Sequence, residues 1–215
     1  MAKTWSEFYP WVMPDVPGCP PLMAEDAIRE AAVEYCDATL AYQVDLDPIS
    51  IVADQRDYVF TLADGLLPVT VKGATVDDEP LISMTADEVA RILGGQWATA
   101  TGTAEYFHQT DEYTVRIYRI PTEALADGLV LKVAVKPAPD AEEVDDKLFN
   151  FHRRGICFGA LSRLMKSPNK PYTNLALSQH YAQAFQSEIG FANNKQARQF
   201  SRGPLRSRPV NGVEL

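Results

Sequence analysis

Residues 145–166, DDKLFNFHRRGICFGALSRLMK, are the stretch on which the fold depends. Acidic residues open this stretch and Lys166 closes it, an order of charges that favours a helix because it complements the helix dipole. Gly155 and Gly159 lie four residues apart and therefore on one face of that helix. Two arginines flank an apolar run that is far too short to span a membrane. We therefore expect the glycines to let another helix of the chain approach closely.

The expected partner is a helix at residues 23–40, MAEDAIREAAVEYCDATL. One face of it, at spacings of three and four residues, carries mostly small side chains. This face consists of Ala24, Ala27, Ile28, Ala31, Tyr35 and Thr39. A third helix, capped by Asn174, is expected at residues 174–193. The three helices are predicted to form one bundle.

Between residues 42 and 137 the sequence changes to short β-rich runs separated by turn signals, a spacing typical of a β-sandwich or barrel. The predicted strands cover residues 49–52, 58–62, 69–76, 81–84, 106–108, 113–120 and 129–135. One short helix interrupts them, because Thr85 and Glu88 form a capping box and Gly94 supplies a stop signal.

The predicted fold class is therefore α+β, a helical bundle with an inserted β-sandwich or barrel-like domain and an extended arm at each end. The N-terminal arm and first bundle helix are assigned to residues 1–44, and the inserted β domain to residues 45–140. The C-terminal bundle helices are assigned to residues 141–195, and a basic C-terminal arm to residues 196–215.

The N-terminal arm is expected to be extended because residues 1–22 contain five prolines, which fix φ and extend the residue before them. This arm also carries Trp5, Phe8 and Trp11. Apolar aromatic side chains need a surface to cover. Two placements remain open for them, the chain's own body and a neighbouring subunit.

Charge is divided unevenly along the chain, whose net charge is −9. Residues 1–146 contain 9 Lys and Arg against 27 Asp and Glu, whereas residues 147–215 contain 11 against 2. Such asymmetry predicts partners of different charge, although a helical surface that merely happens to be basic is the alternative. The acidic total disfavours a general nucleic-acid binder.

The residues that carry chemistry form no recognisable site. The three cysteines are widely spaced and odd in number, which predicts neither a disulfide framework nor a zinc site. His108, His152 and His180 fall in separate elements without metal-ligand spacing. No nucleophile, base and orienting group come together in a motif. We therefore expect no enzyme activity, no metal and no cofactor. With no signal peptide and no membrane segment, we expect a protein made and kept in a cytoplasm.

Taken in order, these segments resemble the head-to-tail adaptor, or connector, proteins of tailed bacteriophages over about residues 5–200. The lead-in W-x-x-F-x-x-x-V-x-P-x-V-P-G-C-P runs from Trp5 to Pro20. The motif A-x-x-E-x-C-x-x-T occupies residues 31–39, K-P-x-P-D-A residues 136–141 and K-P-Y-x-N residues 170–174. The order of these motifs carries the resemblance.

The resemblance implies a structural protein of the virion neck, assembled in the host cytoplasm and without contact to a membrane. Twelve subunits would form a ring beneath the portal protein and join it to a tail or nozzle protein. Genomic DNA would pass through the ring without sequence-specific binding. The C-terminal arm would dock on the portal through Arg198, Phe200, Arg202, Leu205, Arg206 and Arg208. The N-terminal arm would contact a neighbouring subunit through Trp5, Phe8 and Trp11.

Three other functions remain open from the sequence. The nearest is a tail-completion or stopper protein, one ring further down, which the long helices disfavour. A carbohydrate-binding β domain could use Trp97, Tyr106 and Tyr118 as a platform, although core packing explains these aromatics more simply. The third is a hydrolase with an unrecognised site on the β domain.

Overall fold

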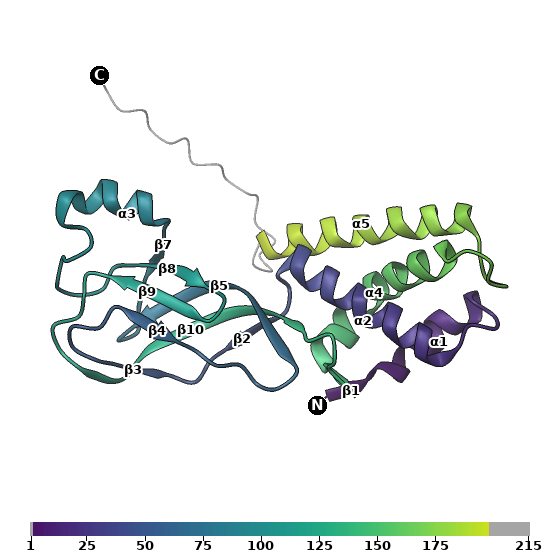
Figure 1. Ribbon diagram of the computed structural model, residues 1–215, viewed down its shortest axis with the longest axis horizontal. Coiled ribbons are helices and arrows are strands. Elements are labelled where there is room, and N and C mark those ends of the chain that lie inside the picture. Colours follow the sequence, from purple (N-terminus) through teal and green to yellow (C-terminus); the bar gives the residue numbers. More distant parts are fainter. Residues whose placement is uncertain (1, 198–215) are drawn as a thin grey trace, which may run out of the picture.

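The computed structural model describes residues 2–197 and shows an elongated molecule, with a helical bundle at one end and a β module at the other (Figure 1). The helices are α1 (Tyr9–Val12), α2 (Pro21–Thr39), α3 (Ala86–Leu93), α4 (Asp146–Lys166) and α5 (Leu175–Ala197). The mixed α+β fold class expected from the sequence is confirmed.

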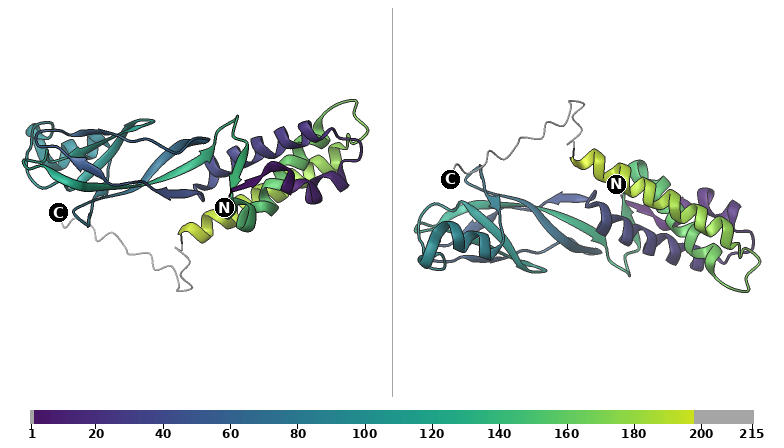
Figure 2. Two further views of the ribbon diagram at one scale, coloured as in Figure 1. Left: turned by 90° about the horizontal axis from the view of Figure 1, so that it is seen from below. Right: turned by 90° about the horizontal axis from the view of Figure 1, so that it is seen from above.

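Helices α2, α4 and α5 lie side by side and make up most of the bundle (Figures 1 and 2). Helix α2 begins at Pro21, where the missing N–H of proline is harmless. It ends where Leu40 adopts a left-handed φ of 52° and donates its N–H to the carbonyl of Cys36 at 2.8 Å. The small-residue face predicted for this helix is buried along its whole length.

The β module consists of two sheets that curl around a common core (Figure 2). The first has the order β2-β10-β5-β6, with β3 also pairing with β10, and the second has the order β4-β9-β8-β7. Their strands are β2 (Gln43–Asp45), β3 (Ile49–Ile51), β4 (Asp57–Val59), β5 (Leu66–Val76), β6 (Glu79–Pro80), β7 (Ile82–Ser83), β8 (Tyr106–Asp111), β9 (Thr114–Tyr118) and β10 (Leu125–Pro137). The capping box at Thr85 and Glu88 is present at the start of α3, as predicted.

The N-terminal segment corrects the prediction of an extended arm. After strand β1 (Ala2–Thr4), residues 5–15 fold into short helical turns: η1 (Trp5–Phe8), α1, and η2 (Met13–Asp15). Pro10 and Pro14 each lie in the first turn of a short helix, where proline is tolerated. The turns form because they bury Trp5 and Phe8 and let the Trp5 indole N–H donate to the carbonyl of Ala141 at 2.7 Å.

Strand β1 pairs antiparallel with β11 (Glu143–Asp145), immediately before α4. The sequence patterns did not indicate β1, β2, β6 or β11. Each has only two or three residues, too few to show a period of two.

The bundle and the β module meet at a junction where the chain enters and leaves the module at neighbouring points. Gln43 in β2 pairs with Ala134 in β10, and the Val135 N–H donates to the carbonyl of Tyr42 at 2.9 Å. An ion pair of 2.9 Å joins Lys136 to Asp37 on α2. One continuous cluster of buried side chains extends from the bundle into the module.

Candidate interaction surfaces

The glycines of α4 lie where this helix approaches α2 and α5 closely. A Cβ atom added at Gly155 would lie 2.7 Å from the Tyr35 ring, and one added at Gly159 would lie 2.9 Å from the Cβ of Ala31. The second of these would also lie 3.0 Å from the ring of Phe185 on α5. Since carbon atoms pack best at about 3.5–4.0 Å, a side chain at either position must displace a neighbouring helix or ring.

The three aromatic residues assigned to the N-terminal arm have different environments. Trp5 and Phe8 are buried in the core of their own chain, so they have no surface left for a neighbouring subunit. Trp11 remains 44% exposed. The Arg153 guanidinium stacks 3.8 Å above its ring, and the ring of Phe149 meets it edge-on with centroids 5.8 Å apart. Of the three, Trp11 alone therefore stays a candidate for an inter-subunit contact.

The six residues assigned to portal docking lie outside the described part of the chain. They are Arg198, Phe200, Arg202, Leu205, Arg206 and Arg208. They follow directly after α5, whose C-terminal end lies at the junction between bundle and module (Figure 1).

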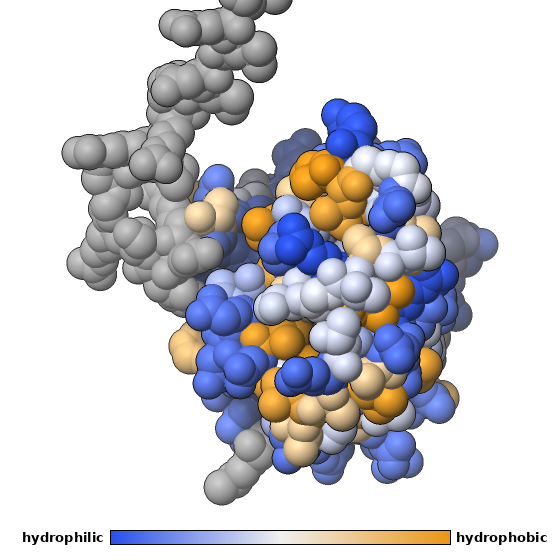
Figure 3. Space-filling view, turned by 90° about the vertical axis from the view of Figure 1, so that its left-hand side faces the viewer, coloured by the Kyte–Doolittle hydropathy of each residue, from blue (hydrophilic) through white to orange (hydrophobic). Residues whose placement is uncertain are grey.

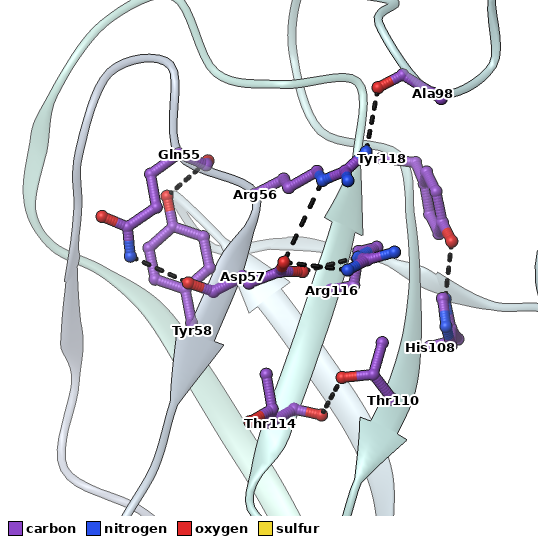
Figure 4. Close-up of polar contacts among 10 residues, drawn as sticks. All are labelled: Gln55, Arg56, Asp57, Tyr58, Ala98, His108, Thr110, Thr114, Arg116 and Tyr118. Carbon is purple, nitrogen blue, oxygen red and sulfur yellow. Dashed lines mark hydrogen bonds and ion pairs between the residues drawn. The ribbon is translucent and has the colours of Figure 1, made fainter.

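A set of polar side chains crosses the four-stranded sheet of the β module (Figure 4). Arg116 donates two hydrogen bonds to the Asp57 carboxylate, at 2.6 and 2.9 Å, and this hydrogen bonding holds the pKa of Asp57 below its usual value. Arg56 lies 4.0 Å from the same carboxylate and donates to the carbonyl of Ala98 at 3.1 Å. The contacts join β4, β9 and the segment after α3, so these groups support the sheet.

The aromatic residues considered for a sugar platform do not form one. Tyr118 is only 2% exposed, and its hydroxyl hydrogen-bonds to Nδ1 of His108 at 2.8 Å, with the two rings stacked. Trp97 packs against Tyr118 with centroids 5.9 Å apart. Burial lowers the pKa of His108, which favours the neutral imidazole in this stack. A sugar ring has no access to the face of Tyr118.

Apolar side chains are exposed at several places on the β module. Figure 3 views the end of the molecule formed by this module and shows apolar patches among hydrophilic residues. The large apolar side chains exposed on the module are Val52, Val59, Ile82 and Ile92, each at least half exposed. Exposed apolar side chains that gather on one end of a protein are candidates for contact with another protein.

The reactive side chains of the described residues are placed for packing. Cys19, Cys36 and Cys157 are all buried and free, and burial raises the pKa of both Cys36 and Cys157 to about 12. Within residues 2–197 no group of three or more His, Cys, Asp or Glu side chains is arranged to hold a metal ion. In the same range no helix is both long and apolar enough to cross a membrane.

One surface was missed from the sequence, a groove at the junction. It is lined by Lys147, Phe151 and His152 of α4 and by Lys195 and Gln196 of α5. Phe151 is 72% exposed, whereas Phe149, two residues earlier, is buried. The two phenylalanines lie on different faces of α4, and Phe149 is buried because the N-terminal segment packs on it through Phe8, at a centroid distance of 5.0 Å.

Residues 2–197 thus show a packed bundle, a β module and exposed apolar side chains on both. Comparison with known families defines the class of protein: residues 11–208 match the family model described as SU10 adaptor protein. The chain therefore belongs to the SU10 adaptor family, a family of phage head–tail adaptors, as the resemblance implied. No curated protein matches the chain.

Proposed function

We propose that this adaptor forms a ring, with the twelve subunits that the resemblance implies, in the neck of a virion between the portal and the tail. The observation that carries the proposal is the family match over nearly the whole chain, joined to an elongated shape with a helical bundle at one end and a β module at the other. Both ends expose large apolar side chains, for example Leu22 and Leu175 on the bundle and Val59 and Ile82 on the module, which suits a protein with a partner at each end.

The portal contact is assigned to the C-terminal arm. The family match extends to residue 208 and so includes all six docking residues. Four of these are arginines, which would steer the arm to an acidic partner and make binding sensitive to salt. Phe200 and Leu205 would provide the apolar anchors. The proposal places the β module toward the tail or nozzle protein.

The charge of the chain suits a passage for DNA. Each subunit carries a net charge of −9, so a ring of such subunits repels the phosphate backbone. Stable binding of duplex DNA depends on clustered Lys and Arg that release counterions. An acidic ring therefore lets genomic DNA pass without holding it.

The test is binding of the full chain and of variants to the purified portal of the same phage, at low and high salt. One variant replaces Arg198, Arg202, Arg206 and Arg208 with Gln, and a second replaces Phe200 and Leu205 with Ser. The control replaces Lys72 and Arg91, two exposed cations of the β module, with Gln.

We expect the arginine variant to bind slowly and with little dependence on salt, the apolar variant to dissociate quickly, and the control to bind like the wild type. Equal binding by all four proteins contradicts the docking role of the arm. A wild-type chain that binds the tail component and not the portal supports the stopper alternative instead.

A further inference from the structure

The junction carries a second hollow, and its lining is acidic. It has a volume of about 660 Å³, and its charged lining residues are all carboxylates. They are Asp64, Asp140, Glu142, Glu143 and Asp145. The first four are exposed and form no ion pair with any residue of the described chain. Four carboxylates around one hollow, none of them paired within residues 2–197, favour a cationic partner.

The groove at Phe151 has the opposite character. It encloses about 350 Å³, its charged lining residues are Lys147 and Lys195, and no carboxylate lines it. Lys147 is exposed and forms no ion pair within residues 2–197. The Lys195 ammonium lies 5.9 Å from the centre of the Phe151 ring. This surface therefore offers cations around an exposed aromatic side chain.

The two surfaces lie on opposite sides of the segment that connects α2 to β2. Ala41 and Gln43 line the cationic groove, whereas Tyr42 lines the acidic hollow. This is the alternation expected of an extended chain, whose successive side chains point in opposite directions. Figure 1 shows the C-terminal end of α5 and strand β1 on opposite edges of the molecule, both near the middle of its long axis.

We propose that the acidic hollow of one copy of this chain receives the cationic groove of the next copy, and that this contact builds the ring. The inference rests on the proposed function, which supplies the ring, and adds the surfaces that close it. A contact of like with like would oppose cations to cations or carboxylates to carboxylates. Only the unlike pairing brings the exposed carboxylates of the hollow against the exposed Lys147 ammonium and also covers Phe151.

The geometry agrees with a ring. A contact between two different surfaces repeats from copy to copy and closes into a ring when the rotation permits. Because both surfaces lie near the middle of the long axis, this contact would relate neighbouring copies by rotation about an axis roughly parallel to it.

The test uses two charge-reversed forms of the full chain. Variant A carries Asp140→Lys, Glu142→Lys and Glu143→Lys, and variant B carries Lys147→Glu and Lys195→Glu. The matched control reverses three exposed carboxylates of the β module that form no ion pair within the described chain, with Asp47→Lys, Glu112→Lys and Glu123→Lys. Self-association is measured by mass photometry and sedimentation at 50 and 500 mM salt, both alone and on the purified portal. Melting temperature shows whether each variant is folded.

We expect variants A and B each to need at least tenfold more protein than the control for assembly. An equimolar mixture should restore assembly as rings in which A and B alternate. In such a ring the reversed hollow of A meets the reversed groove of B, and the native hollow of B meets the native groove of A. Zero-length carbodiimide coupling of mixed unlabelled and ¹⁵N-labelled wild-type chains should join residues 140–143 of one copy to Lys147 of another.

Three outcomes overturn the proposed interface, and a fourth overturns the ring on which it rests. If A and B assemble at the same protein concentration as the control, the proposed interface is excluded. The ring and the family assignment are then unaffected. If variants A and B are both folded but do not assemble when mixed, the pairing of the hollow with the groove is excluded. If deleting residues 198–215 abolishes assembly while variants A and B still assemble, the contact between subunits belongs to the C-terminal arm. A wild-type chain that is monomeric both alone and on the portal contradicts the proposed ring itself.

Discussion

Replacing Gly159 with Ala tests the close approach of α4 to α2. The new methyl group would lie 2.9 Å from the Cβ of Ala31 and 3.0 Å from the Phe185 ring. The ring can turn away, but a Cβ atom is fixed to its backbone. The helices must therefore separate by roughly 0.6 Å or more to reach an ordinary carbon–carbon contact.

Two opposing effects set the size of the change. Overpacking a core typically costs about 1–3 kcal/mol. Alanine is favoured over glycine in a helix by about 1 kcal/mol. The free energy of unfolding of Gly159→Ala should therefore fall by about 1 kcal/mol, which lowers the melting temperature by about 2–4 °C in a chain of this size.

The control is Gly190→Ala on α5, where an added Cβ has no neighbour within 4 Å. This substitution keeps the gain in helix propensity without the clash, so it should stabilise the chain by up to about 1 kcal/mol. Adding Ala31→Gly to Gly159→Ala moves the methyl group to the opposite helix and should recover most of the packing loss. Urea unfolding of these three variants and of the wild type measures the differences. Equal stabilisation by the two Gly→Ala changes would refute the close crossing.

Three further predictions follow from burial and charge. Trp5→Ala should cost about 3–5 kcal/mol in urea unfolding, whereas Trp11→Ala should cost about 1 kcal/mol or less, because only the first ring is fully buried; equal losses contradict the assignment. Hydrogen bonds from Arg116 lower the pKa of Asp57 in the folded chain. The Asp57–Arg116 ion pair therefore stabilises the fold above the unfolded pKa of about 3.9, and this stabilisation is lost as pH falls through the folded pKa. Asp57→Asn should therefore lower the urea midpoint at pH 7 by the equivalent of less than about 1 kcal/mol, with no effect near pH 2; an equal effect at both pH values excludes the ion pair. Thiol reagents should label Cys36 and Cys157 only as the chain unfolds, since burial raises the pKa of both thiols to about 12, and rapid labelling of the native chain contradicts this.

The sequence predicted the parts of the fold that depend on repeated local patterns. The buried face of α2, from Ala24 to Thr39, repeats at spacings of three and four residues. The capping box likewise joins Thr85 to Glu88, three residues later, so both features are local in the sequence. The N-terminal segment was mistaken because prolines suit both an extended arm and the first turn of a helix. The choice between them depends on a hydrogen bond from Trp5 to Ala141, a partner far along the chain.

The surfaces at the junction were not predictable from local patterns. The acidic hollow joins Asp64 to residues 140–145, and the groove joins α4 to the end of α5. Charge counting did show that acidic and basic residues are divided along the chain. It could not show that β1, β11 and β2 bring the two kinds of charge to opposite sides of one connection.

The insertion of the β module between α2 and α4 also sets the order in which the parts of the chain are synthesised. Helix α2 is complete at Thr39, but its packing partner begins only at Asp146. At a synthesis rate of about 5–20 residues per second, the small-residue face of α2 waits roughly 5–20 s for that partner to be made. Within that interval the module can fold first, and the pairing of Gln43 with Ala134 then holds the two ends of the helical segments together. If the module folds first, the loop between α2 and α4 is closed in advance and the two helices meet at a lower entropic cost, so we expect the bundle to be the last part of the chain to fold.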